Sequence, residues 1–137
     1  MAITVQSITP SFAAEVGDVD LSRPLAADDL AAIRAAFTKY AVLVFPDQHF
    51  DDDSQLDFAR NFGPLETTVF KARKEHKLRL HENIADVGNL DAENRILAAN
   101  DRQRLYNLGN RLWHTDSSFK RLPAYCSMLH ARSIPPI

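Results

Sequence analysis

Apolar and polar positions in the first half of the chain follow different periods, and each period predicts an element. Residues 3–8 alternate apolar and polar side chains, which is typical of a half-exposed strand. Residues 28–40 repeat apolar side chains three and four positions apart, so these share one stripe of a helix. The stripe consists of Leu30, Ile33, Phe37 and Tyr40. Acidic residues begin this segment and Lys39 lies near its end, the signs that complement a helix dipole.

Shorter apolar runs complete this half. Residues 16–21 read as a turn and short strand around Gly17. The run 41–45 is apolar throughout, which is typical of a strand covered on both faces. A second helix is predicted over residues 52–62, and Gly63 with the following proline ends it.

The second half predicts strands that have no obvious partners. Residues 77–84 begin as an alternating strand, and residues 86–101 read as a loop or short helix. Two further strands are predicted at 112–119 and 125–133. They carry side chains of the kind found in cores, namely Trp113, Phe119, Met128, Leu129 and Ile134. Because the chain ends soon afterwards, we expect a sheet that stops with an unpaired edge.

Composition excludes several classes of protein. The 137 residues suit one domain, and 16 basic against 18 acidic residues (net charge −2) give no general attraction for nucleic acid or anionic membrane. A single cysteine, Cys126, forbids an intrachain disulfide and favours a reducing compartment. The N-terminus lacks the pattern of a signal peptide, and no apolar run is long enough to span a bilayer. We therefore expect a cytoplasmic protein with no nucleic-acid or membrane partner.

The strongest chemical signal is the segment from Trp113 to Asp116. On a strand, His114 and Asp116 point to the same face because they are two positions apart. An imidazole and a carboxylate side by side form two legs of the facial triad of non-haem Fe(II) oxygenases. That triad leaves coordination positions open for a cosubstrate and O2. By itself, a His-x-Asp pair in a chain with five histidines is also compatible with an ordinary polar pair.

The residues around this pair resemble a known family. Residues 110–119 (NRLWHTDSSF) are similar to the metal-binding strand of the taurine/2,4-dichlorophenoxyacetate dioxygenases. Four further blocks resemble the same family in the same order: residues 14–22, 42–45, 58–66 and 125–136. The run from Asp116 to Phe119 is closer to the phenoxyacetate branch than to the taurine branch.

The resemblance implies a mainly β fold with flanking helices, an incomplete double-stranded β-helix (jelly roll). Residues 1–137 would be the N-terminal part of a single dioxygenase domain whose C-terminal part is absent. His114 and Asp116 would bind Fe(II), with 2-oxoglutarate as cosubstrate. O2 would convert the cosubstrate to succinate and CO2 while a small organic anion, phenoxyacetate-like or sulfonate-like, is hydroxylated. The family's third iron ligand and its 2-oxoglutarate arginine would lie beyond Ile137, so this fragment alone is expected to be inactive.

Two residues are candidates for the substrate pocket. Lys71, in the basic stretch 70–79, stands where the family places an anion-contacting residue, although a solvated surface is the plainer interpretation of that stretch. Asn110 also matches a pocket position, although it could simply end the turn at Gly109. The remaining histidines are expected to have ordinary surface or packing roles: His49, His76, His81 and His130. We do not expect Cys126 to be a nucleophile, because no basic neighbour in sequence lowers its pKa.

Three readings stay open at this stage. The chain is a stretch of a working dioxygenase, or it is a non-enzymatic truncated remnant with an incomplete iron site. A polyanion-binding module using residues 70–79 is the third, and the net charge argues against it. The sequence leaves homo-oligomer formation undecided.

Overall fold

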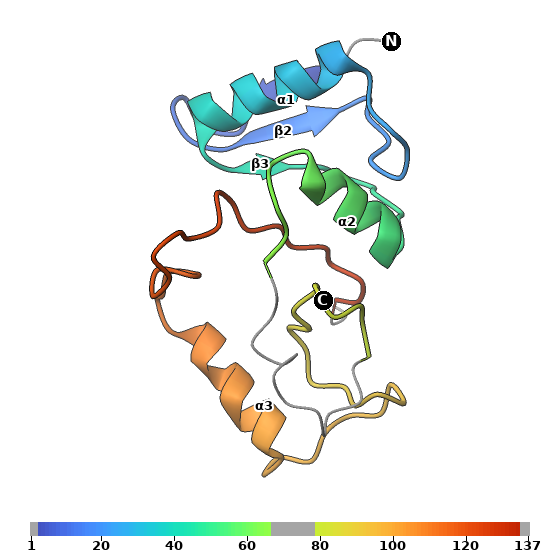
Figure 1. The fold of residues 1–137 in the computed structure, drawn as a ribbon, viewed down its shortest axis with the longest axis vertical. Coiled ribbons are helices and arrows are strands. Elements are labelled where there is room, and N and C mark those ends of the chain that lie inside the picture. The colour runs from blue at the N-terminus through green and yellow to red at the C-terminus, as the bar shows by residue number, and fades with distance from the viewer. Residues whose placement is uncertain (1–2, 67–78, 135–137) are drawn as a thin grey trace. The chain divides into compact units, whose positions relative to one another are not determined.

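The computed structural model describes residues 3–66 and 79–134 (Figure 1). The chain divides into two compact units, a first unit of residues 1–61 and a second unit of residues 62–137. The single domain expected from the sequence stays a prediction.

The first unit contains a three-stranded sheet in the order β1-β2-β3. Strand β1 (Thr4–Ser7) pairs antiparallel with β2 (Ala14–Gly17), so the strand predicted at residues 3–8 is confirmed. Strand β3 (Leu43–Val44) pairs with β2 in the parallel direction. Parallel neighbours need a crossover connection, and helix α1 (Ala27–Tyr40), which runs alongside the sheet, supplies it (Figure 1).

The predicted helix over residues 28–40 is therefore confirmed. Its buried residues are Ile33, from the predicted stripe, and Ala36. The helix ends at Tyr40, and the next residue, Ala41, adopts a positive φ of 62° while its N–H donates to the carbonyl of Phe37. The N-cap residue Ala26 has no side chain that can cap, so the acidic first turn contributes through its charge alone.

The strand predicted at residues 41–45 is shorter and more exposed than expected. Only Leu43 and Val44 pair, and β3 lies at an edge of the sheet. Val42 and Val44 are 41% and 44% exposed. The prediction of a strand covered on both faces was wrong. An apolar run indicates that a segment tends to be buried, but it does not indicate whether the strand lies in the middle or at the edge of its sheet.

The buried apolar side chains among the described residues all belong to the first unit. They are Ala14, Val16, Leu21, Ile33, Ala36, Leu56 and Phe58. Gln48 ties the loops beside this core: its side-chain oxygen accepts from the Leu21 N–H at 2.8 Å, and its amide nitrogen donates to the Val19 carbonyl at 3.0 Å. These bonds satisfy backbone groups that no strand pairs.

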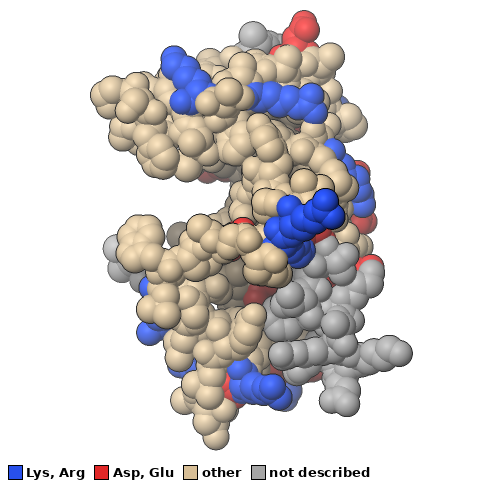
Figure 2. All heavy atoms as spheres, turned by 60° about the vertical axis from the view of Figure 1, so that its left-hand side comes forward, with Lys and Arg blue, Asp and Glu red and all other residues tan. Residues whose placement is uncertain are grey.

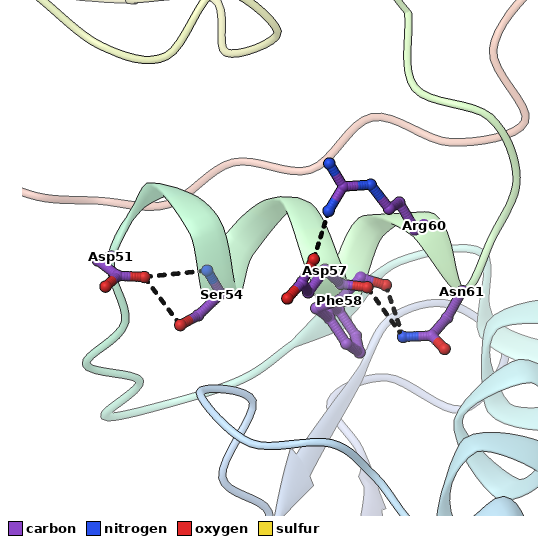
Figure 3. Close-up of polar contacts among 6 residues, drawn as sticks. All are labelled: Asp51, Ser54, Asp57, Phe58, Arg60 and Asn61. Carbon is purple, nitrogen blue, oxygen red and sulfur yellow. Dashed lines mark hydrogen bonds and ion pairs between the residues drawn. The ribbon is translucent and has the colours of Figure 1, made fainter.

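Helix α2 (Asp52–Arg60) confirms the second predicted helix, and Figure 3 shows why it begins and ends where it does. The Asp51 carboxylate caps it by accepting from the backbone N–H and the hydroxyl of Ser54, at 2.9 and 2.8 Å. At the other end, the Asn61 side-chain amide donates to the Phe58 carbonyl at 3.0 Å. This cap ends the helix at Arg60, two residues before the predicted boundary.

The described part of the second unit has little regular structure. Helix α3 (Arg102–Asn107) continues into the short 3-10 helix η2 (Leu108–Arg111), and Leu90 forms an isolated bridge with Ile96. Helix α3 was not predicted, although Asp101 is a good N-cap signal: its carboxylate accepts from the Gln103 N–H at 2.8 Å.

The strands predicted in the second unit are wrong over the described residues. Residues 79–84, 112–119 and 125–133 form no strand there. Four of the five side chains expected in a core are exposed, including Trp113 at 105% and Leu129 at 89%, and Met128 is half-buried. A strand requires a neighbour that offers its own N–H and C=O groups, and the described part of this unit offers none at these positions. The expected jelly roll therefore stays a prediction.

The described surface has mixed character. In the view of Figure 2, the Lys and Arg side chains stand in separate groups among uncharged residues. Residues 3–66 and 79–134 contain no helix that is long and apolar enough to cross a bilayer.

Candidate metal centre

His114 and Asp116 lie together in the second unit, directly after η2. The Nε2 atom of His114 is 3.4 Å from Oδ1 of Asp116, and the two side chains are 48% and 59% exposed. Leu112, where η2 ends, has extended backbone angles (φ −93°, ψ 149°). The i and i+2 side chains therefore lie side by side, as expected on a strand, although residues 112–116 form no strand.

The ring of His114 is oriented by the backbone. Its Nδ1 atom lies 2.8 Å from the carbonyl oxygen of Leu112. A carbonyl oxygen only accepts hydrogen bonds, so Nδ1 carries the proton and donates. In the neutral ring, Nε2 then presents its lone pair on the side of Asp116, as a metal ligand requires.

The two oxygens of Asp116 have different neighbours. Oδ2 accepts a hydrogen bond of 2.7 Å from the hydroxyl of Ser127, eleven positions later in the chain. Oδ1 is the oxygen that faces His114. The carboxylate is thus oriented by one bond and presents its other oxygen beside the imidazole.

A second polar cluster holds the turn after Asp116. One oxygen of Glu66, Oε2, accepts from the Ser117 hydroxyl at 2.6 Å and from Nζ of Lys120 at 3.0 Å. The hydrogen bond from Ser117, followed by that from Lys120, holds the pKa of the Glu66 carboxyl below its usual range, against smaller opposing effects of desolvation and the charge of Asp116.

The backbone at this turn is unusual. Ser117 adopts a φ of 57°, a left-handed conformation that costs a residue with a side chain about 1–2 kcal/mol. The turn is closed by the Lys120 N–H, which donates to the Ser117 carbonyl at 2.9 Å. Such a conformation persists where its surroundings fix it, and the Glu66 contacts provide that restraint.

The donor set of this pair suits Fe(II) as far as it goes. An imidazole nitrogen and a carboxylate oxygen are the ligand types of the facial triad. The 3.4 Å between Nε2 and Oδ1 would allow both atoms to hold one metal ion. Within residues 3–66 and 79–134, no third histidine, cysteine or carboxylate joins them to make a group of three.

The substrate candidates are less informative. Asn110 lies in η2 with an exposed side chain, and its role in a pocket stays a prediction. Lys71 lies outside the described residues. Arg79, the end of the basic stretch, makes a two-pronged ion pair with Asp86, with nitrogen–oxygen distances of 2.6 and 2.7 Å and side chains that are only 20% and 18% exposed. That arginine has a structural partner and is not a solvated cation.

Sequence reasoning assigned no role to the residues that orient the pair. Three of these residues lie within segments that resemble the dioxygenase family: Glu66, Ser117 and Ser127. Neither the hydrophobic periodicity nor the sequence spacing indicates that they are close to one another. Glu66 is 51 positions from Ser117, with which it bonds. The only available signal was the joint presence of those segments in one family.

Comparison with known proteins gives a consistent result. A family model described as "Taurine catabolism dioxygenase TauD, TfdA family" matches residues 4–137. The chain is 35% identical to the alpha-ketoglutarate-dependent 2,4-dichlorophenoxyacetate dioxygenase of Cupriavidus pinatubonensis, over 99% of this chain and 47% of that protein. It is 33% identical to the (S)-phenoxypropionate/alpha-ketoglutarate-dioxygenase of Sphingobium herbicidovorans, over 77% of this chain and 32% of the relative. The chain thus spans less than half the length of these curated relatives.

Solved structures agree. The crystal structure of AAD-2 in complex with Mn(II) and N-oxalylglycine is similar with a TM-score of 0.79 and 40% identity, covering 90% of this chain and 43% of that one. A putative alpha-ketoglutarate-dependent 2,4-D dioxygenase from Burkholderia xenovorans matches with a TM-score of 0.61 and 32% identity, over 89% of this chain and 35% of the other.

Proposed function

The chain belongs to the TauD/TfdA family of dioxygenases, and on that premise we propose that it is the N-terminal part of an Fe(II)- and 2-oxoglutarate-dependent dioxygenase. Its relatives are named for alpha-ketoglutarate dependence and for phenoxy compounds. One observation supports assigning the iron site to His114 and Asp116: the Nε2 atom of His114 lies 3.4 Å from Oδ1 of Asp116.

In this proposal, His114 and Asp116 hold the iron as two of its protein ligands. The metal, when bound, supplies the coordination of 2-oxoglutarate and O2 and the oxidising power for hydroxylation. The chain contributes orientation: the Leu112 carbonyl fixes the His114 ring, and the Ser127 hydroxyl fixes the Asp116 carboxylate. The third iron ligand and the arginine that binds 2-oxoglutarate belong to a part of the domain outside this chain.

We propose a small organic anion as substrate, phenoxyacetate-like or sulfonate-like. The names of the relatives support the phenoxy class. Lys71 and Asn110 are the residues of this chain that we place in its pocket, Lys71 as a point charge for the anionic group. The same proposal includes O2 as a further reactant, a cytoplasmic location, and no nucleic-acid or membrane partner.

The test is metal binding by the chain itself. Mn(II) is titrated into the protein while the electron paramagnetic resonance signal of free Mn(II) is recorded, a readout that registers weak as well as tight binding. We expect His114→Ala and Asp116→Ala each to weaken binding by more than about tenfold, since even residues that only support a ligand have effects of about 10- to 100-fold. The matched control is His49→Ala, which removes an exposed histidine from the first unit. Equal affinities for the unmodified chain and for both ligand variants would refute the metal site.

A further inference from the structure

The carboxylate of Asp116 is held asymmetrically. Its Oδ2 accepts the Ser127 hydroxyl hydrogen at 2.7 Å, whereas Oδ1 lies 3.4 Å from Nε2 of His114. A free carboxylate can rotate and offer either oxygen, or both, to a metal. In this structure one oxygen is already occupied by a hydrogen bond and the other is presented beside the imidazole.

We propose that Ser127 is a positioning residue that selects Oδ1 of Asp116 as the metal-binding oxygen and keeps its coordination monodentate. The inference rests on the proposed function, because it assumes that Asp116 is a ligand. A hydroxyl has a single proton to donate, and Ser127 directs it to Oδ2. Rotation that brings Oδ2 toward the metal breaks this bond, so the bond favours one coordination geometry over the others.

The backbone of Asp116 is restrained independently. The next residue, Ser117, has a φ of 57°, and its hydroxyl donates to Glu66 at 2.6 Å. Lys120 donates to the same Glu66 oxygen at 3.0 Å and closes the turn with its backbone N–H. The Glu66 cluster thus fixes where the Asp116 side chain begins, and Ser127 fixes how its carboxylate is rotated.

The effect of Ser127 does not come from packing. Its side chain is exposed, and none of the buried apolar residues lies in the second unit among the described residues. Removing one exposed hydroxyl therefore deletes the bond to Asp116 and little else. A positioning role of the hydroxyl can therefore be distinguished from a structural role. Threonine and valine have the same shape and differ in the hydroxyl, so they test the hydroxyl alone.

The experiment uses the Mn(II) titration of the 137-residue chain with four variants. Ser127→Ala and Ser127→Val lack the hydroxyl, and Ser127→Thr keeps it in the shape of valine. Ser133→Ala removes another exposed serine of the same segment and serves as the control. We expect about tenfold weaker binding for the alanine and valine variants, the lower end of the effects known for residues that support ligands, and affinity within about twofold of the unmodified chain for the threonine variant and the control.

The outcomes separate the two proposals. Affinities of Ser127→Ala and Ser127→Val that match the unmodified chain, while His114→Ala binds more weakly, overturn the positioning role and leave the metal site standing. An unmodified chain that binds no better than His114→Ala overturns the metal site, and the role of Ser127 with it. Circular dichroism of each variant checks folding, and the threonine–valine pair keeps the comparison valid if the alanine variant alone loses structure.

Discussion

Replacing Ile33 with alanine should destabilise the first unit strongly. Ile33 is fully buried, with 0% of its surface exposed, on the face of α1 that forms the core. The substitution deletes aliphatic carbons worth about 0.8 kcal/mol each and leaves a cavity, so the expected loss is about 2–5 kcal/mol. That is a large part of the roughly 5–15 kcal/mol by which a typical domain is stable.

The assay is urea unfolding followed by far-UV circular dichroism, which reports helix content, and α1 is the longest helix that the structure describes. Fluorescence is the poorer probe, because the single tryptophan, Trp113, is already fully exposed in the second unit. With a slope of about 1–3 kcal/mol per molar urea, the midpoint should fall by about 1 M or more. The matched control is Leu129→Ala, which shortens an aliphatic side chain that is 89% exposed and should change stability by less than about 0.5 kcal/mol. Equal midpoints for the two variants would refute the assignment of the core.

Three further outcomes are expected. Asp51→Ala, which removes the cap of α2, should lower the urea midpoint by less than Ile33→Ala does, and Asp51→Asn should restore most of the loss because its side chain also accepts the Ser54 N–H; an alanine variant as stable as the original would contradict the capping role. The Glu66 carboxyl, followed by carbon NMR against pH, should titrate below its ordinary pKa of 4.5, so its stabilising contacts are present above that pH and vanish as the pH falls through the lowered value. In Ser117→Ala this titration should move upward, and an unchanged midpoint would show that the hydroxyl is not the main cause. The 137-residue chain supplied with Fe(II), ascorbate and 2-oxoglutarate should release no succinate catalytically, and turnover by this exact chain would show that it carries a complete site.

The sequence predicted the first unit better than the second, and the reason is physical. Helices α1 and α2 depend on hydrogen bonds within one segment, and their periodicity and end residues can be read locally. Gly63 and the proline after it, for example, predicted the end of the second helix, which stops at Arg60. Strands are different, because each depends on a partner distant in sequence. The apolar run at 41–45 does contain a strand. Its length of two residues, however, is set by the pairing with β2, which the run itself does not reveal.

The site shows the same division. His114 and Asp116 were predictable as a pair because extended backbone brings i and i+2 side chains together. Their partners were not, because Ser127 and Glu66 reach the pair and its turn from other segments. The positive φ at Ser117 had no sequence signal either, since glycine or asparagine is the usual residue in that conformation.

The buried apolar core and the candidate metal site are formed by different residues, and this affects how genetic variation in the protein should be interpreted. The buried apolar residues that the structure describes lie between positions 14 and 58, whereas His114, Asp116 and Ser127 are polar residues with much of their surface in water. A mutational scan that scores cellular abundance would therefore record damage mainly at the first set and pass over the second. On the proposed function, a scan that scores metal capture would record both. The difference between the two maps, position by position, would outline the site without any knowledge of the substrate.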